Sequence, residues 1–98
     1  QPHRYSRLML LKNDFSSAFK DSDLVILCPV YSAGEKVNTK YNEINFAKLI
    51  SQNSDVQVIM VKNEKELKKF FIKNLLNKEI VVCMGAGSIS KWIREMNL

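Results

Sequence analysis

The 98-residue sequence predicts an α/β domain in which a mainly parallel sheet is covered by helices on both faces. Two observations predict it. Segments with apolar residues at helical spacing alternate with short, mostly apolar runs. The longest run, residues 24–30, is apolar at successive positions, as in parallel strands buried on both sides. Alternation of this kind is typical of strands joined by helical crossovers.

Four helices are expected from the apolar spacing. The first spans about residues 7–20, with Ser6 as its N-cap. The second spans about residues 41–52 and the third residues 64–76. The closing helix is marked by four apolar residues: Ile89, Trp92, Ile93 and Met96.

Three strands are expected, at residues 24–30, 56–61 and 79–84. A tight turn at residues 85–87 and a loop at residues 31–39 follow two of them. Ligand sites in parallel sheets form beyond the carboxyl ends of the strands, so both segments fall where a site is expected. Three strands are few for this architecture, which predicts that the chain is a piece of a larger domain.

Composition limits the function classes. The chain is 46% hydrophobic with little Gly or Pro, which indicates a packed domain, and no apolar run is long enough to cross a bilayer. The net charge is +5, much of it from lysines around the third helix. Those lysines do not alternate with exposed aromatics, so a solvated helix face is preferred to nucleic-acid binding. Cys28 and Cys83 lie in apolar runs and are interpreted as buried free thiols in a reducing cytoplasm. Their spacing fits no metal site.

The first seven residues, Gln1 to Arg7, are dense in side chains that bind anions or move protons. They include the one histidine, His3, and two arginines, Arg4 and Arg7, three positions apart. Paired guanidinium groups suit a carboxylate or a phosphate, because each can donate two parallel hydrogen bonds. A solvated basic terminus is the alternative interpretation of the same residues.

Gly85, Ala86 and Gly87 follow an expected strand and open a helix. This context resembles a dinucleotide-binding turn, but the third glycine position is Ser90. Backbone N–H groups at such a turn can bind an anion. A tight turn that needs glycine for steric reasons alone explains the sequence equally well. The chain contains no phosphate-binding loop of the Gly-x-x-x-x-Gly-Lys-Ser/Thr type, so any ATP chemistry requires another domain.

Several motifs in fixed order resemble the C-terminal domain of the Mur ligases of peptidoglycan synthesis. They are Gln1-Pro2-His3-Arg4-Tyr5-Ser6-Arg7, Asp14-Phe15, Val30-Tyr31-Ser32-Ala33-Gly34-Glu35 and Gly85-Ala86-Gly87-Ser88-Ile89. The resemblance spans residues 1–98 and implies a Rossmann-like three-layer αβα domain. It also implies that the strand and helix that open this domain are missing, as is the strand that leads into Gln1.

The resemblance implies a cytoplasmic, three-domain ligase that joins L-alanine to UDP-N-acetylmuramate through an acyl phosphate, with ATP and Mg²⁺ bound mainly by a central domain. This chain would close over the site, would hold no metal and would be inactive alone. Eight positions match the family's substrate-facing segments: His3, Arg4, Arg7, Tyr31, Glu35, Gly85, Ala86 and Gly87.

Within that set, the resemblance implies that Arg4 and Arg7 face the L-alanine carboxylate or the acyl phosphate, and that His3 orients their loop or contacts substrate. Tyr31 and Glu35 would line the same cleft, although both could be ordinary loop residues. Glu35 would face the substrate ammonium or an arginine. The alternative function is a stand-alone Rossmann-like module that binds an anionic metabolite or nucleotide.

Overall fold

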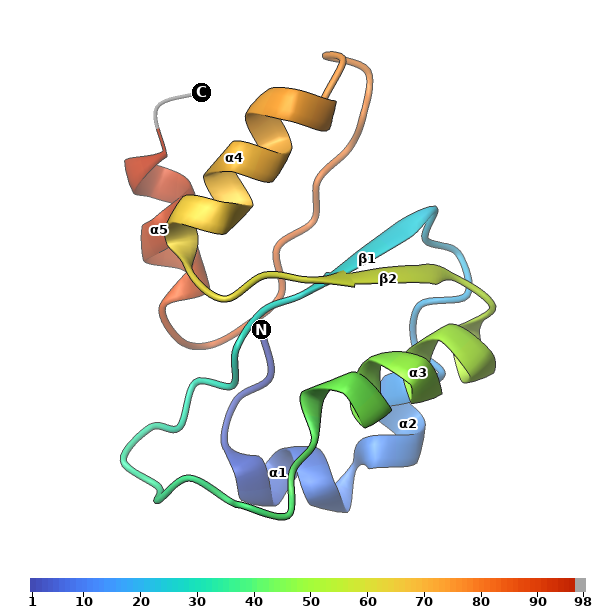
Figure 1. Ribbon diagram of the computed structural model, residues 1–98, viewed down its shortest axis with the longest axis vertical. Coiled ribbons are helices and arrows are strands. Elements are labelled where there is room, and N and C mark those ends of the chain that lie inside the picture. Colours follow the sequence, from blue (N-terminus) through green and yellow to red (C-terminus); the bar gives the residue numbers. More distant parts are fainter. Residues whose placement is uncertain (97–98) are drawn as a thin grey trace.

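The computed structural model describes residues 1–96 and shows an α/β fold with a two-stranded parallel sheet (Figure 1). The elements in chain order are α1 (Tyr5–Leu10), α2 (Lys12–Ser16), β1 (Leu24–Leu27), α3 (Glu43–Ser54), β2 (Gln57–Met60), α4 (Glu64–Asn74) and α5 (Ile89–Glu95). No helix in the described part of the chain is long and apolar enough to cross a membrane.

The strands β1 and β2 run parallel, as predicted, with Leu24 opposite Gln57 and Leu27 opposite Met60. The N–H of Val61 also donates to the carbonyl of Leu27, at 3.1 Å, just beyond the paired residues. Both strands are shorter than the apolar runs that predicted them.

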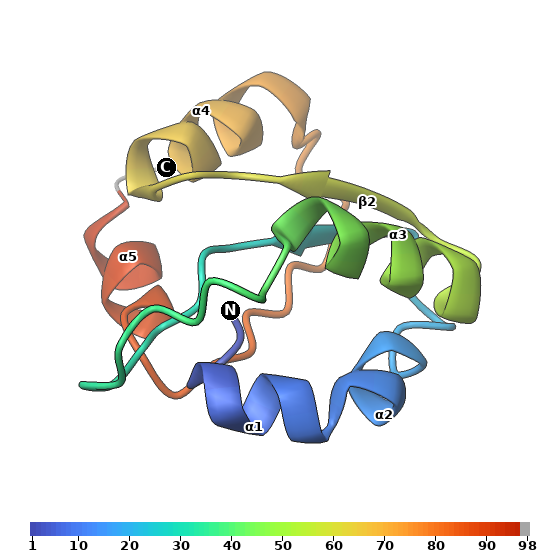
Figure 2. The same ribbon diagram turned by 60° about the horizontal axis from the view of Figure 1, so that its bottom comes forward.

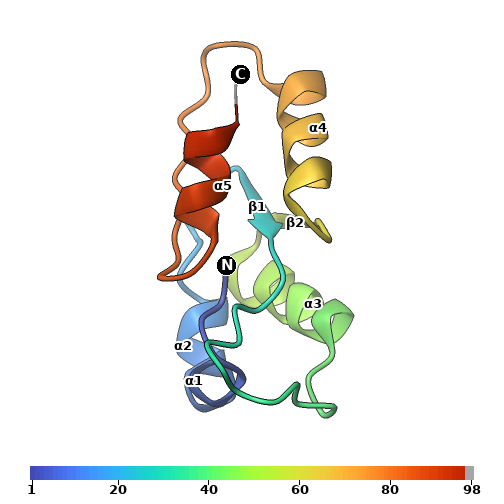
Figure 3. The ribbon, with the colours of Figure 1, turned by 90° about the vertical axis from the view of Figure 1, so that its left-hand side faces the viewer.

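Side chains from the two faces of the sheet enter two separate apolar clusters, because successive strand residues point to opposite faces. Val25 and Leu27 enter the first cluster, and Ile26 and Cys28 enter the second. Figures 2 and 3 show α1, α2 and α3 on one side of the sheet and α4 and α5 on the other. The first cluster is formed by Leu8, Val25, Leu27, Phe46, Ala47, Ile50 and Val56. The second is formed by Cys28, Val61, Leu67, Phe71, Ile89 and Met96.

The helix α4 starts at Glu64, as predicted, whereas α3 starts at Glu43, two residues after its predicted start. Asn42 caps α3, its side chain accepting from the N–H of Asn45 at 2.9 Å, and Asn63 caps α4 by accepting from Glu66 at 2.9 Å. Each bond satisfies one of the free N–H groups of a helix's first turn.

The single helix predicted over residues 7–20 is wrong. Two short helices replace it, and the chain breaks at Leu11. The hydroxyls of Ser16 and Ser17 both donate to the carbonyl of Asn13, at 2.9 and 2.8 Å. Side-chain bonds of this kind compete with a regular helix, and α2 ends at Ser16, where they lie. Ser6 is not the N-cap, since α1 starts at Tyr5 after Arg4 and has no side-chain cap.

The strand predicted at residues 79–84 is also absent, although its composition is typical of a strand. A strand requires a hydrogen-bonding neighbour, and within residues 1–96 β1 pairs only with β2. Ile80 and Val82 are 90% and 72% exposed. Cys28 is buried as predicted, but Cys83 is exposed, which corrects its interpretation as a buried thiol.

Candidate functional site

Three segments that are far apart in the sequence meet at one end of the sheet, and we call their meeting point the loop junction. They are residues 1–7, residues 31–35 and residues 84–89. The first enters α1, the second follows β1, and the third leads into α5. The sequence placed the second and third segments beyond the carboxyl ends of strands, but the strand expected before the third segment is absent, and bonds to Gln1 hold that segment here.

His3 and Tyr31 form the centre of the loop junction. An isolated parallel bridge joins them: the N–H of Tyr31 donates to the carbonyl of Pro2, and the N–H of Arg4 donates to the carbonyl of Tyr31, both at 2.8 Å. The two rings stack with their centroids 5.6 Å apart and their planes 23° from parallel. The Nδ1 atom of His3 is buried and has no hydrogen-bond partner among the described residues.

Gln1 ties the opening segment to the turn before α5. Its backbone nitrogen donates to the carbonyl of Met84 at 2.9 Å. Its side-chain amide donates to Ser88 Oγ at 2.9 Å and accepts from the N–H of Ile89 at 3.1 Å. A free N–H in the first turn of α5 is therefore satisfied by Gln1.

Glu35 is held against the start of α1. Its carboxylate accepts from the hydroxyl of Ser6 at 2.5 Å and from the N–H of Ser6 at 3.2 Å. These bonds hold the pKa of Glu35 below its ordinary value, and the bond from the Ser6 hydroxyl has the largest effect. The positive charge of Arg4 acts in the same direction. A turn over residues 32–35 places Glu35. In this turn the N–H of Glu35 donates to the carbonyl of Ser32 at 3.0 Å, and both Ala33 and Gly34 have positive φ.

The backbone of Arg4 has an unusual conformation. Its φ is 63° and its ψ is 136°, a combination that residues with a Cβ rarely adopt. Two hydrogen bonds hold this conformation: the N–H of Arg4 donates to the carbonyl of Tyr31, and the carbonyl of Arg4 accepts from the N–H of Leu8. The side chains of Arg4 and Arg7 are both exposed.

The glycines of the last segment are needed for close packing. A Cβ on Gly87 would lie 2.2 Å from Cγ of Tyr31, and one on Gly85 would lie 2.9 Å from Cγ2 of Ile89 and 3.0 Å from the carbonyl oxygen of Gln1. Ala86 between them is exposed. These contacts support the steric explanation of the glycine turn. From the sequence alone, this explanation and anion binding were equally good.

Of the eight predicted site residues, contacts join His3, Arg4, Tyr31, Glu35, Gly85 and Gly87 at the loop junction. Ala86 and Arg7 lie in the same segments without such a contact. Sequence reasoning gave no role to Gln1 and assigned Ser6 to a helix cap. Neither residue carries a charge or a motif of its own that would have marked these long-range bonds.

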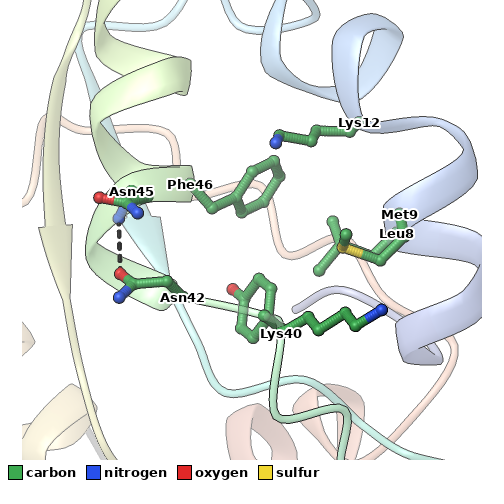
Figure 4. A pocket seen from close by; sticks show the side chains of 8 residues that line it. Leu8, Met9, Lys12, Lys40, Asn42, Asn45 and Phe46 are labelled. Atoms are coloured by element: carbon green, nitrogen blue, oxygen red, sulfur yellow. Dashed lines mark hydrogen bonds between the residues drawn. The ribbon is translucent and has the colours of Figure 1, made fainter.

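A separate hollow of about 80 Å³ lies between α1 and the start of α3, and no predicted site residue lines it (Figure 4). Leu8, Tyr41 and Phe46 form much of its wall, and Lys12 and Lys40 reach its edge. The hydroxyl of Tyr41 is buried without a partner among the described residues, and burial raises the pKa of that phenol.

Metal-binding side chains do not gather in residues 1–96: nowhere in that range do three His, Cys, Asp or Glu side chains come together in a way that could hold a metal ion. The groups that the loop junction presents for binding a ligand are its polar backbone, two exposed guanidinium groups, one carboxylate and one imidazole.

Comparison with known proteins identifies relatives over almost the whole chain. The UDP-N-acetylmuramate–L-alanine ligase of Pelagibacter ubique (strain HTCC1062) is 51% identical over 96 residues, covering 98% of this chain and 21% of that protein. The chain is homologous to one segment of these ligases. The UDP-N-acetylmuramate–L-alanine ligase of Rhodospirillum rubrum is 38% identical over 96 residues, covering 98% of this chain and 20% of that protein.

The ligase of the same name from Synechocystis sp. (strain ATCC 27184 / PCC 6803 / Kazusa) is 37% identical over 93 residues. It covers 95% of this chain, which spans 18% of that protein. The chain thus spans about a fifth of the length of the UDP-N-acetylmuramate–L-alanine ligases it matches. No protein-family model matches it. The resemblance to the Mur ligases inferred from the motifs is confirmed by these relatives.

Proposed function

We propose that this chain is part of the C-terminal domain of an ATP-dependent, cytoplasmic ligase that adds L-alanine to UDP-N-acetylmuramate. The observation that carries the proposal is the 51% identity over 96 residues with a protein of that name. The gathering of His3, Arg4, Tyr31 and Glu35 at one end of the sheet supports it further, because these are residues that the family's motifs contain.

In this proposal the loop junction faces the amino-acid substrate. Arg4 and Arg7 bind the carboxylate of L-alanine or the charge that develops on an acyl phosphate, for which a guanidinium fork is suited. Their exposure leaves both side chains free to reach a ligand. His3 orients the loop through its stacking on Tyr31. Glu35 lines the same cleft and already accepts two bonds from Ser6, so it acts mainly by holding the arginine loop in place.

The rest of the proposed enzyme supplies what this chain does not. ATP and Mg²⁺ are held mainly by another domain, as the resemblance to the Mur ligases implies. The domain of which this chain is part is a Rossmann-like three-layer αβα unit, supported by the helices on both sides of the parallel sheet. Its closure over the site brings positive charge to an anionic intermediate and excludes water from it.

The test is kinetic and uses the full-length ligase. Arg4→Ala and Arg7→Ala should each raise KM for L-alanine or lower kcat/KM by about 10- to 100-fold, the usual effect of losing a charged hydrogen bond. Arg94→Ala is the matched control, since Arg94 is equally exposed but lies in the last turn of α5, away from the loop junction. Kinetics in both loop variants no different from those of Arg94→Ala would contradict the assignment.

A further inference from the structure

An open groove of about 430 Å³ runs between β2 and α4. Residues 59–61, at the end of β2 and just beyond it, form one wall. The other wall is one face of α4, formed by Glu66, Lys69, Phe70, Lys73 and Asn74. Figures 2 and 3 show α4 on the β2 side of the sheet and α5 on the β1 side. The described residues that line the groove include none of the eight predicted site residues, so this inference is independent of the proposed function.

The outer edge of β2 is free beside this groove. The N–H of Val61 donates to the carbonyl of Leu27, so it points toward β1. Successive residues of a strand direct their peptide groups to opposite edges, so those of Val58 and Met60 point away from β1. Within residues 1–96, β2 pairs with β1 alone. The N–H and carbonyl groups of these two residues are therefore available to a further strand.

The next outward-pointing residue, Lys62, already has an acidic partner. Its N–H donates to the carboxylate of Glu66 at 2.7 Å. This bond confirms the alternation along the edge, because Lys62 follows Val61 and donates away from β1. It also shows that a carboxylate can reach this edge from the side of α4.

Positive charge surrounds the groove. Residues 62–73 contain five lysines and two glutamates. Lys69 and Lys73 both line the groove, are exposed, and lie four positions apart on one face of α4. Lysines beside an edge strand oppose pairing with basic or neutral strands, and they attract an acidic one. The charge of the groove therefore selects the kind of strand that can bind there.

We propose that the outer edge of β2 binds an extended acidic segment of another protein, which joins the sheet as an additional strand. Its backbone bonds to Val58 and Met60, and its acidic side chains face Lys69 and Lys73. Alternate residues on one face of a strand are about 6.6 Å apart, and residues four apart in a helix are separated by about 6 Å along its axis. The favoured segment therefore carries acidic residues at alternate positions.

A second copy of the chain fits this edge less well. Antiparallel pairing of two β2 edges about a twofold axis would place both α4 helices on the same face of the joined sheet. Lys69 and Lys73 of one copy would then face the same lysines of the other, and like charges at that distance repel. An acidic segment neutralises these charges instead.

Peptide binding to the full-length protein tests the proposal. The probe is a peptide of about eight residues that alternates valine and aspartate and is blocked at both ends. It should bind in calorimetry and slow hydrogen exchange at the amides of Val58 and Met60 by at least about 10-fold at saturation. The same peptide with lysine in place of aspartate should not bind. Failure of the aspartate peptide to bind, or equal binding of the two, would overturn the proposal.

Hydrogen exchange without peptide decides whether the edge is free. The amides of Val58 and Met60 should then be unprotected at all protein concentrations. Constant protection would assign the edge to another part of the longer protein, and protection that grows with concentration would assign it to a second copy. Either result would overturn the proposal.

A methylated peptide separates strand pairing from attraction between charges alone. N-methylation of every amide keeps the aspartates but removes the backbone donors, so binding should fall by at least about 10-fold. Undiminished binding would mean that the peptide is held by its charges alone, which would overturn the proposal.

A matched pair of substitutions in the full-length protein tests the groove itself. Lys69→Glu should weaken binding of the aspartate peptide by about 10-fold. Lys91→Glu is the control, because it changes the net charge equally at an exposed position of α5, outside the groove. Equal weakening by the two substitutions would show that only the net charge matters and would overturn the proposal.

Discussion

Gly87 lies directly against the ring of Tyr31. A Cβ at position 87 would come within 2.2 Å of Cγ and 2.6 Å of Cδ1 of that ring, far closer than real Cβ contacts allow. The ring of Tyr31 also stacks on the ring of His3. The turn before α5 therefore fixes the position of Tyr31, which in turn fixes His3.

Gly87→Ala should displace Tyr31 and destabilise the loop junction. Overpacking of this kind costs about 1–3 kcal/mol in unfolding free energy, measurable by thermal or chemical denaturation. Ala86→Ser is the control, because Ala86 is exposed and its substitution should have little effect. A Gly87→Ala protein as stable as Ala86→Ser would show that Tyr31 does not rest on this turn.

The bond between Ser6 and Glu35 should make stability depend on pH. The folded pKa of Glu35 is below its unfolded value, so the carboxylate stabilises the fold above the unfolded pKa, about 4.3, and that contribution is lost as the pH falls through the folded value. Ser6→Ala should thus destabilise the protein at pH 7, and much less at pH 3, in thermal unfolding. Ser17→Ala, which removes a bond to a neutral carbonyl, should show no such pH dependence.

Ser54 joins the end of α3 to the chain after α2 from a buried position. Its hydroxyl donates to the carbonyl of Ser16 at 2.5 Å and accepts from the N–H of Phe19 at 3.1 Å. Ser54→Ala would leave both backbone groups without a partner and should cost about 1–3 kcal/mol in unfolding free energy. Ser51→Ala in the same helix is the control, since Ser51 is exposed. Equal costs at the two positions would refute the role given to Ser54.

Asp55 ends α3 in a left-handed conformation, with φ 50° and ψ 53°. Glycine adopts this conformation without strain, and a negative side chain at a helix C-terminus is unfavourable. Asp55→Gly should therefore raise the unfolding free energy by roughly 0.5–1 kcal/mol. Asp55→Ala separates the two causes: it removes the charge but keeps the Cβ, so it should gain less. A gain for Ala as large as that for Gly would rule out backbone strain as the cause.

The sequence predicted best those elements whose signals are local. The helices α3 and α4 have regular apolar spacing, β1 is an uninterrupted apolar run, and β2 is apolar after Gln57. The strand predicted at residues 79–84 has the same local signal and failed, because a strand also requires a neighbour that is distant in the sequence. The early end of α2 at Ser16 was missed because serine hydroxyl bonds to the carbonyl of Asn13 compete with a regular helix there, and the break at Leu11 has no local signal in the sequence.

At the loop junction, the sequence predicted which segments meet but not how they are held. The position of Tyr31 and Glu35 after β1 was enough to bring them toward Arg4. The bonds that fix the geometry, from Ser6 to Glu35 and from Gln1 to Ser88, join residues 29 and 87 positions apart. Neutral polar side chains carry no sequence pattern that identifies such a partner, so the sequence alone does not predict these bonds.

The two apolar clusters are separated by the sheet. At the loop junction, a segment from one side of the sheet contacts a segment from the other side. Residues 1–7 lead into α1 on one side, and residues 84–89 lead into α5 on the other. A molecule bound across the loop junction would therefore restrain both halves at once. By thermodynamic linkage, a molecule that binds only when both clusters are packed stabilises that packing, and a substitution that loosens either cluster should weaken the molecule's affinity. The loop junction would then report on the integrity of both halves of the domain.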